Sequence, residues 1–128
     1  MPTIRTIVRT EVVTADPSAT ARELAGLMGE ELVGSVVVVE DGRPVGIVTD
    51  RDLMLKVIGH ERDPETTTAA DVMADNVVTV DVDAGVFEVL STMAEESIRR
   101  APAVDEDGTL AGIVTFDDFV ALLGRELG

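Results

Sequence analysis

Two copies of one pattern lie in tandem along the chain, and this internal repeat constrains the fold more than any other feature. The sequence VVTAD at residues 12–16 returns as VVTVD at residues 77–81. GIVT at residues 46–49 returns unchanged at residues 112–115. The second interval is longer by a single position, which falls in an Asp-Gly turn, where insertions are tolerated. The repeat predicts that both copies form the same structural unit.

Each copy has the pattern of a β-α-β-β-α unit. A short strand, at 12–15 or 77–80, precedes a helix with apolar residues at helical spacing, and Ser18 and Asp83 are the predicted N-caps. Two further strands follow, and the Asp-Gly turn between them is typical of a hairpin. A short helix after GIVT completes the copy.

A unit of about 60 residues is marginally stable alone, because so small a domain buries little apolar surface. We therefore expect an α+β fold in which the two repeats pack about a pseudo-twofold axis into one module. The predicted repeats span residues 1–60 and 72–128, with a linker at residues 61–71.

Composition limits the partners and the location. The chain has 25 acidic and 10 basic residues, a net charge of −15 and a single lysine, Lys56. Such a surface repels nucleic acid and anionic lipid, so neither nucleic acid nor a membrane is an expected partner. The acidity is typical either of an ordinary acidic protein or, as the scarcity of lysine favours, of adaptation to high salt. The absence of cysteine and of any apolar run of about 18 residues predicts a cytoplasmic protein.

The most informative motif is Thr-x-x-Asp directly after GIV, at Thr49 and Asp52 and again at Thr115 and Asp118. This spacing is that of a capping box, which needs no ligand. The same geometry also suits a ligand, because a carboxylate at a helix N-terminus can accept both hydroxyls of a ribose, and nearby backbone N–H groups can face a phosphate. Both interpretations stay open, since a capping threonine can also donate to a ligand.

Two β-α-β-β-α copies that each run from VVT through Asp-Gly to GIVT-x-x-Asp resemble tandem cystathionine-β-synthase (CBS) domains. The resemblance covers roughly residues 6–125 and includes DVM at residues 71–73 and TDRDL at residues 49–53. It implies a regulatory CBS pair that binds an adenosine-containing ligand, such as AMP, ADP, ATP or S-adenosylmethionine, and requires no other cofactor. It also implies a homodimer and a regulated partner protein.

The resemblance further implies which residues bind the ligand. Asp52 and Asp118 would hold the ribose, and the first strands would offer backbone groups and apolar walls to adenine. Arg99 and Arg100 precede Pro102, where nucleotide-sensing members place cations that meet phosphate. The implied residues are Val13, Thr14, Ala15, Thr49 and Asp52 in the first copy, and Val78, Thr79, Val80, Arg99, Arg100, Thr115 and Asp118 in the second.

The two copies differ just after the threonine, where the first has Arg51 and the second has Asp117. Arg51 can pair with a phosphate, whereas Asp117 adds a negative charge that opposes a polyphosphate. The sequence therefore predicts that the Asp52 site binds a nucleotide better than the Asp118 site. The alternative is that Arg51 lies on a solvated helix face, and that the paired arginines of the second copy bind neighbouring carboxylates.

Nothing in the sequence indicates catalysis. His60 is the single histidine, no serine or threonine has an evident His-Asp partner, and clustered His and Cys ligands for a metal are absent. The chain is therefore expected not to be an enzyme, but either a sensor of an adenosine-type ligand or an interaction scaffold with empty clefts. The expected dimer contacts are the apolar helix faces that contain Met54 and Val57 and, in the second copy, Val120 and Leu123.

Overall fold

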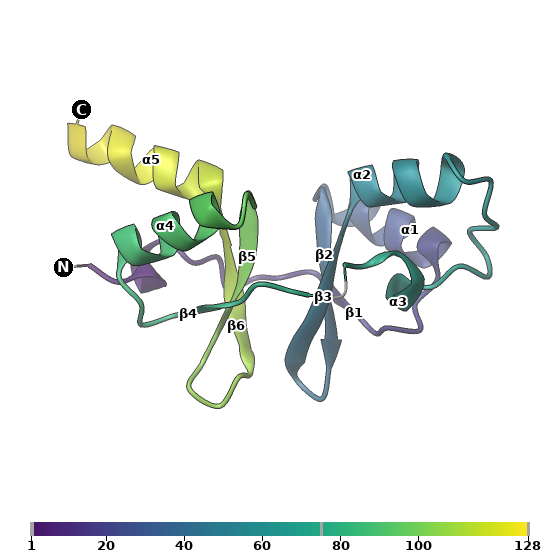
Figure 1. Cartoon of the computed structure of the whole chain (residues 1–128), viewed down its shortest axis with the longest axis horizontal. Helices are drawn as coiled ribbons and strands as arrows, with labels where there is room; N and C mark the ends of the chain where they lie inside the picture. Colours follow the sequence, from purple (N-terminus) through teal and green to yellow (C-terminus); the bar gives the residue numbers. More distant parts are fainter. Residues whose placement is uncertain (1, 75, 128) are drawn as a thin grey trace. The chain divides into compact units, whose positions relative to one another are not determined.

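The computed structural model describes residues 2–74 and 76–127, and its secondary structure is α+β, as the repeat predicts. The described residues form two three-stranded sheets, each in its own compact unit (Figure 1). One unit spans residues 12–77 and is called the central unit below. The other joins residues 2–11 to residues 78–127 and is called the split unit.

The central unit contains the first copy from its first strand onward, together with the short helix that begins the second copy. Its sheet has the order β1-β2-β3, with β1 parallel to β2 and β2 antiparallel to β3. The elements are β1 (Thr14–Ala15), α1 (Ala21–Glu31), β2 (Ser35–Glu40), β3 (Arg43–Thr49), α2 (Asp50–Asp52), the π-helix η2 (Leu53–Ile58) and α3 (Ala69–Val72).

The split unit repeats this plan with the second copy from its first strand onward, together with the short helix that begins the first copy. Its sheet has the order β4-β5-β6, again with one parallel and one antiparallel pair. The elements are the 3₁₀ helix η1 (Ile4–Thr6), β4 (Val80–Asp81), α4 (Val86–Glu95), β5 (Arg100–Val104), β6 (Leu110–Thr115) and α5 (Phe116–Leu127).

Even the irregularities of the two sheets correspond. The hairpin register shifts between Val38 and Val39 in the central unit, and between the equivalent residues Ala103 and Val104 in the split unit. A bulge at the same place in both sheets gives both hairpins the same local bend. The duplication is therefore preserved at the level of single hydrogen-bonded pairs.

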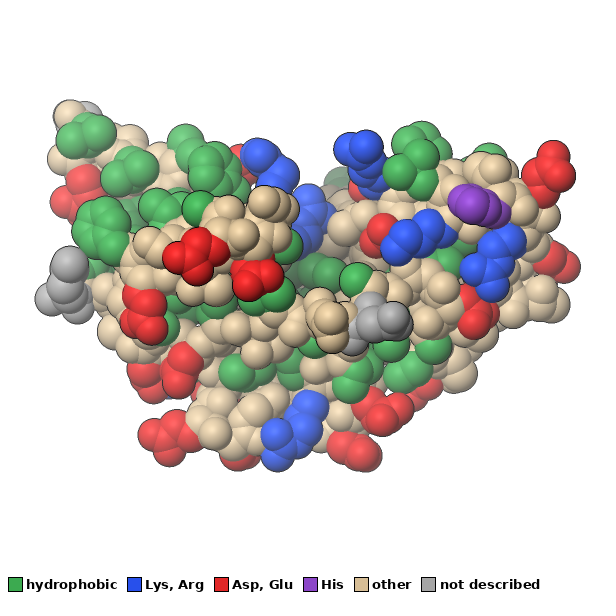
Figure 2. Space-filling view, viewed as in Figure 1, with side chains coloured by type: hydrophobic (Ala, Val, Ile, Leu, Met, Phe, Trp, Pro, Cys, Tyr) green, Lys and Arg blue, Asp and Glu red, His purple; other side chains and the backbone are tan. Residues whose placement is uncertain are grey.

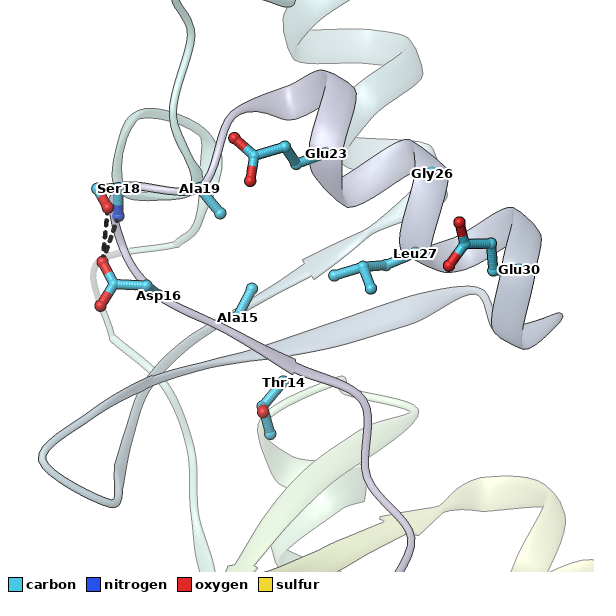
Figure 3. A pocket seen from close by; sticks show the side chains of 9 residues that line it. All are labelled: Thr14, Ala15, Asp16, Ser18, Ala19, Glu23, Gly26, Leu27 and Glu30. Carbon is cyan, nitrogen blue, oxygen red and sulfur yellow. Dashed lines mark hydrogen bonds between the residues drawn. The ribbon is translucent and has the colours of Figure 1, made fainter.

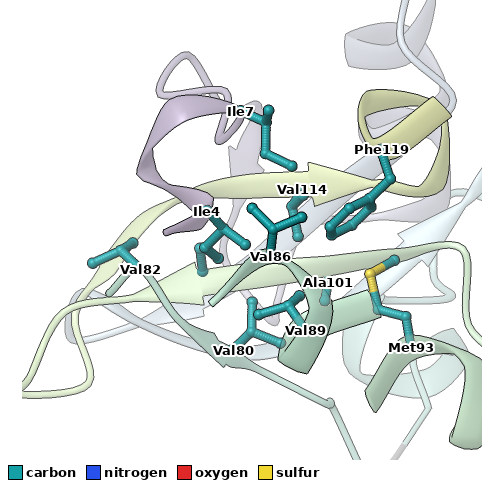
Figure 4. Packing of buried hydrophobic residues seen from close by; sticks show 11 residues of the cluster. Ile4, Ile7, Val80, Val82, Val86, Val89, Met93, Ala101, Val114 and Phe119 are labelled. Atoms are coloured by element: carbon teal, nitrogen blue, oxygen red, sulfur yellow. The ribbon is translucent and has the colours of Figure 1, made fainter. Parts of the chain in front are cut away.

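Each unit has its own apolar core. In the split unit the core lies between the sheet, η1 and the two helices α4 and α5, and Phe119 is its largest side chain (Figure 4). In the central unit the core is built mainly of valines, with Leu24 and Met28 of α1 packed against the sheet. Alternate buried residues of the strands face these cores, as the period of a strand requires.

The two sequence copies exchange their first segments, residues 2–11 and 69–74, which are called the exchanged segments below. Ile4, at the start of the first copy, donates its backbone N–H to the carbonyl of Ala84 in the split unit, at 3.0 Å. Ala69, its equivalent in the second copy, donates in the same way to the carbonyl of Ala19 in the central unit, at 2.8 Å. Both residues are fully buried. The segment that begins each copy therefore completes the core of the other one, which the sequence analysis did not predict.

The predicted N-caps Ser18 and Asp83 are wrong by two residues. The helices are capped by Thr20 and by Gly85, because the backbone N–H groups of Ser18 and Asp83 are already bonded to upstream aspartates. These aspartates hold a turn before each helix, which delays its start. The predicted repeat boundaries at residues 60 and 72 stay a prediction, since the compact units are divided by contact and not by sequence similarity.

Acidic side chains are spread over the visible face of both units and are not gathered into one patch (Figure 2). None of the helices in the described part of the chain has the length and apolarity needed to cross a bilayer.

Candidate functional site

The first Thr-x-x-Asp motif lies where β3 ends and α2 begins. Asp52 accepts a hydrogen bond at Oδ2 from the Thr49 backbone N–H at 2.8 Å, and Thr49 Oγ1 accepts one from the Asp52 N–H at 3.0 Å. The predicted capping box is thus confirmed. Asp52 Oδ1 lies 3.3 Å from Nζ of Lys56, whose ammonium also donates to the Val72 carbonyl at 2.7 Å. The Asp52 side chain keeps 25% of its surface exposed.

The second motif has the same cap and a different environment. Asp118 Oδ2 accepts from the Thr115 N–H at 2.9 Å, and Thr115 Oγ1 accepts from the Asp118 N–H at 3.3 Å. Its Oδ1 accepts a hydrogen bond from Nε of Arg9 at 3.0 Å and lies 2.9 Å from Nη2 in an ion pair. The Asp118 side chain is only 7% exposed. The hydrogen bond to Asp118, and then its charge, raise the pKa of Arg9.

The same spacing occurs where no ligand site is predicted. Thr20 and Glu23 form a complete capping box on α1, and Thr68 donates its backbone N–H to Asp71 Oδ2 at 2.9 Å at the start of α3. The spacing alone therefore marks a helix start. A ligand site needs further features around the carboxylate.

The strand residues implied by the resemblance lie at comparable places in the two sheets. Thr14 and Ala15 form β1 and pair with Val37 and Val38, and the carbonyl of Val13 accepts the Val37 N–H at 3.0 Å. Thr49 pairs with Ser35, which lies near Val37 on β2, the middle strand of the sheet. Val13 and Thr49 therefore lie toward the same end of the sheet. Three strands span about 10 Å across the sheet.

In the split unit the corresponding strand begins later than predicted. β4 is Val80–Asp81, and Val80 is 6% exposed and part of the core. Val78 is half-buried and Thr79 exposed, both just before the strand. Val80 therefore offers no side-chain surface to a ligand, whereas Val78 and Thr79 keep theirs.

The arginines predicted to meet phosphate are in different situations. Arg51 is exposed, and in the described part of the chain no carboxylate lies within ion-pairing distance of its guanidinium. Arg99 stacks its guanidinium 5.1 Å from the centroid of the Phe116 ring and lies 4.0 Å from Asp117. Arg100 begins β5, opposite Thr115. The alternative of carboxylate pairing is thus realised for Arg99.

A surface pocket of about 520 Å³ lies beside β1 (Figure 3). It brings Thr14 and Ala15 together with the exposed face of α1, and its charged lining residues are Asp16, Glu23 and Glu30. Three carboxylates without a cation in the lining repel a phosphate group. Thr49 and Asp52 do not line this pocket, so the sequence-predicted residues of the first copy are divided between two places.

Sequence reasoning missed two cations beside the key carboxylates, Arg9 and Lys56. A usable signal for Arg9 existed, because the offset that relates the two VVT motifs also relates Ile4 and Ile7 to Ala69 and Val72, at helical spacing. Extending the repeat upstream in this way predicts that the residues before the first strand also belong to a copy.

Comparison with known proteins identifies the family. The family model of the CBS domain matches residues 4–59 and 69–125, which begin at the two equivalent segments Ile4–Thr6 and Ala69–Val72. The chain belongs to the CBS-domain family.

Relatives include solved structures. An uncharacterised protein of Methanopyrus kandleri is 43% identical over 115 residues, which are 89% of this chain and 59% of that protein. Hypoxic response protein 1 of Mycobacterium tuberculosis is 34% identical over 119 residues, covering 92% of this chain and 82% of that one. Its crystal structure superposes with a TM-score of 0.84, over 94% of this chain and 98% of that chain. The chain therefore spans less than two thirds of the first of these relatives.

The CBS domain pair of protein MJ0100 is a third relative, with 26% identity and a TM-score of 0.86 over 98% of both chains. That structure is a complex with 5′-methylthioadenosine and S-adenosylmethionine. The structure of hypoxic response protein I contains two coordinated zinc ions. In residues 2–74 and 76–127 of the present chain, no three His, Cys, Asp or Glu side chains are grouped as metal ligands would be.

Proposed function

We propose that this CBS pair is a regulatory module that binds an adenosine-containing ligand through Asp52. One observation carries the proposal: Asp52 is held by its cap at the end of β3, is partly exposed, and has the uncompensated guanidinium of Arg51 next to it in sequence. Of the two Thr-x-x-Asp motifs, this one combines a partly exposed carboxylate with a neighbouring cation that no carboxylate pairs in the described part of the chain. The ligands of the MJ0100 pair support an adenosine-type molecule.

The cap prepares Asp52 to bind a ribose. The Thr49 N–H uses one lone pair of Oδ2 and fixes the side-chain rotamer, so little entropy is lost when a ligand arrives. Oδ1 and the remaining lone pair of Oδ2 can each accept one hydroxyl of a vicinal diol. The carboxylate therefore recognises the sugar, and the identity of the rest of the ligand depends on other contacts.

Charge separates the candidate ligands. The net charge of −15 repels the phosphates of AMP, ADP and ATP, and the repulsion increases with their number. Arg51 attracts the phosphate that lies nearest to it. S-adenosylmethionine and 5′-methylthioadenosine carry no phosphate. We expect Arg51→Ala to weaken AMP several-fold and to leave 5′-methylthioadenosine unchanged. Equal losses for the two ligands would mean that Arg51 does not contact phosphate.

Isothermal titration tests the binding itself. We expect Asp52→Asn to weaken 5′-methylthioadenosine or S-adenosylmethionine at least tenfold, which corresponds to about 1.4 kcal/mol. Asp71→Asn is the matched control, because it removes the same kind of helix cap from α3, where no site is proposed. If the two variants bind alike, the assignment of Asp52 is wrong.

Regulation follows from binding to one conformation in preference to another. A ligand shifts a conformational equilibrium only by its difference in affinity for the two states, and a cytoplasmic partner protein would bind one of them. The CBS pair itself would carry no catalytic group. A bound adenosine ligand raises the unfolding temperature more the tighter it binds, as the logarithm of its concentration over Kd, so a thermal screen at one ligand concentration identifies the preferred one.

The completeness of the caps favours a second candidate, an interaction scaffold without a ligand. In both motifs the threonine and the aspartate already satisfy each other. On this alternative, no adenosine compound raises the unfolding temperature, and Asp52→Asn lowers stability without any change in binding.

We also propose that the chain forms a homodimer through its exposed apolar helix faces. In the split unit, hydrophobic side chains gather over α4 and α5 (Figure 2) and include Val120 and Leu123, which are 52% and 44% exposed. In the central unit, Met54 and Ile58 are exposed, whereas Val57 is 3% exposed and belongs to the core, contrary to the predicted face. Sedimentation of Val120→Glu tests this, since a dimer should dissociate to monomer.

A further inference from the structure

The exchanged segment at the start of the chain places an arginine on the second carboxylate. Arg9 pairs with Ile113 of β6 through two backbone hydrogen bonds, each 2.9 Å long. This pairing fixes the Cα of Arg9 beside the end of β6, from which its side chain reaches Asp118. Gly112 permits the close approach, because a Cβ there would collide with Val8 and the Arg9 carbonyl.

The central unit lacks this contact because of one residue. The exchanged segments correspond at the same offset as the VVT motifs: the bridge Thr3↔Gly85 matches Thr20↔Thr68, and the hydrogen bond from Val8 to Ile4 matches that from Met73 to Ala69. The residue equivalent to Arg9 is therefore Ala74, which is exposed. An alanine has no group that can reach Asp52.

We propose that Arg9 occupies the Asp118 carboxylate in place of a ribose, so that the chain offers one adenosine site, at Asp52, and holds the second closed. This inference rests on the proposed function, since it concerns the second copy of the same site. Arg9 is then the residue that determines how many ligands one chain binds.

The chemistry of the contact explains why the second site stays closed. The carboxylate is an ionised acceptor for either donor, but a guanidinium adds its own positive charge, so it forms an ion pair that a neutral ribose hydroxyl cannot form. Asp118 Oδ1 accepts from Nε of Arg9 and is ion-paired with Nη2, and Oδ2 accepts from the Thr115 N–H, so both oxygens are engaged. Arg9 is also tethered by its backbone, so it competes with any free ligand at a high local concentration.

Lys56 beside Asp52 does not close the first site in the same way. Its ammonium lies 3.3 Å from Oδ1 and donates to the Val72 carbonyl, so Asp52 does not hold it alone. Asp52 remains 25% exposed, against 7% for Asp118. A diol can therefore approach Asp52 while Lys56 stays bound to its carbonyl.

Counting bound 5′-methylthioadenosine tests the inference. This probe has the adenine and the ribose diol but no net charge, so removing an arginine does not alter its long-range attraction to the protein. We expect one molecule per chain for wild type and two for Arg9→Ala, by equilibrium dialysis and calorimetry. Asp52→Asn should bind none, and Asp52→Asn with Arg9→Ala should bind one, lost again when Asp118→Asn is added.

Arg5→Ala is the matched control. Arg5 lies in the same exchanged segment and pairs with the exposed Asp83 at 2.6 Å, so its removal deletes an equal charge without touching Asp118. Arg5→Ala should keep one site. Arg9→Gln gives a second test if Arg9→Ala folds poorly, because it keeps the aliphatic stem and removes the charge.

Different results separate this inference from the proposed function. Two molecules per wild-type chain, or one for Arg9→Ala and Arg9→Gln alike, overturns the closure by Arg9. No binding to wild type but one molecule bound to Arg9→Ala overturns the Asp52 site and supports the closure. No binding to any variant overturns both.

Discussion

The Asp52 and Asp118 motifs have the same spacing and the same helix cap, yet different residues surround their carboxylates. Asp52 is partly exposed beside Lys56 of the following π-helix η2, and Asp118 is buried beneath Arg9, from the other end of the chain. The cap belongs to the repeat, whereas the arginine comes from an exchanged segment. The helix cap is thus the same in both copies, and single residues outside the motif make the two sites different.

The largest difference between the two cores should follow from Phe119, which is 1% exposed in the split unit. Its equivalent in the central unit is Leu53, which is only half-buried. We expect Phe119→Ala to lower the free energy of unfolding by about 3–5 kcal/mol, and Leu53→Ala by about 2 kcal/mol. Denaturant titration measures both, and hydrogen exchange shows which unit opens. Equal losses would contradict the difference in packing.

The glycines Gly46 and Gly112 should tolerate a methyl group unequally. At Gly112 an added Cβ would meet the backbone carbonyl of Arg9 at 2.5 Å, which cannot move without displacing the exchanged segment. At Gly46 it would meet the flexible side chain of Met73, which can change rotamer. We expect Gly112→Ala to destabilise by about 2–3 kcal/mol and Gly46→Ala by about 1 kcal/mol. Thermal unfolding of both variants at the same pH shows whether Gly112→Ala loses more stability than Gly46→Ala.

Truncating the two aspartates should reveal the contribution of Arg9 to stability. Asp52→Ala removes a helix cap, worth about 1 kcal/mol. Asp118→Ala removes a cap and also the partner of Arg9, so we expect about 2 kcal/mol. Adding Arg9→Ala to each variant makes a double-mutant cycle. The losses in the free energy of unfolding should be non-additive for Arg9 with Asp118 and additive for Arg9 with Asp52.

The exchanged segments should differ in their response to acid. A backbone hydrogen bond from Thr68, then one from its side chain, lowers the pKa of Asp71, while Thr6 occupies the equivalent position in the split unit. A lowered pKa in the folded state means that ionised Asp71 stabilises the fold at neutral pH and that this contribution is lost as pH falls through the pKa. Asp71→Asn should therefore lower the unfolding temperature slightly at pH 7 and not at all in strong acid. A difference that persists in acid would contradict this assignment.

Much of the fold could be predicted from the repeat and from local turn chemistry. The predicted Asp-Gly turns are confirmed by positive φ at Gly42 and Gly108, 78° and 84°, which favour glycine. Helix starts were misplaced because the side chains of Asp16 and Asp81 hold turns that only coordinates reveal. Turn and helix-capping motifs depend on residues that are close together in sequence, so they predict only local structure.

The environment of each site could not be predicted in the same way. Arg9 and Asp118 are 109 residues apart, and no local pattern links a segment before the first strand to a helix in the last quarter of the chain. The contact depends on the exchange of segments, which is a property of the tertiary structure. The capping boxes at Thr49 and Thr115 were therefore predictable from local spacing, whereas the contact between Arg9 and Asp118 was not.

The exchange of first segments has a consequence for the origin of the chain. A one-copy ancestor would lack a piece of its own core and could obtain it only from a second molecule, as in domain-swapped dimers. Gene duplication joined the two partners, so that an encounter between molecules became a fold within one polypeptide. Once the partners were covalently linked, each half became free to mutate on its own, and a symmetric ancestor could become an asymmetric descendant.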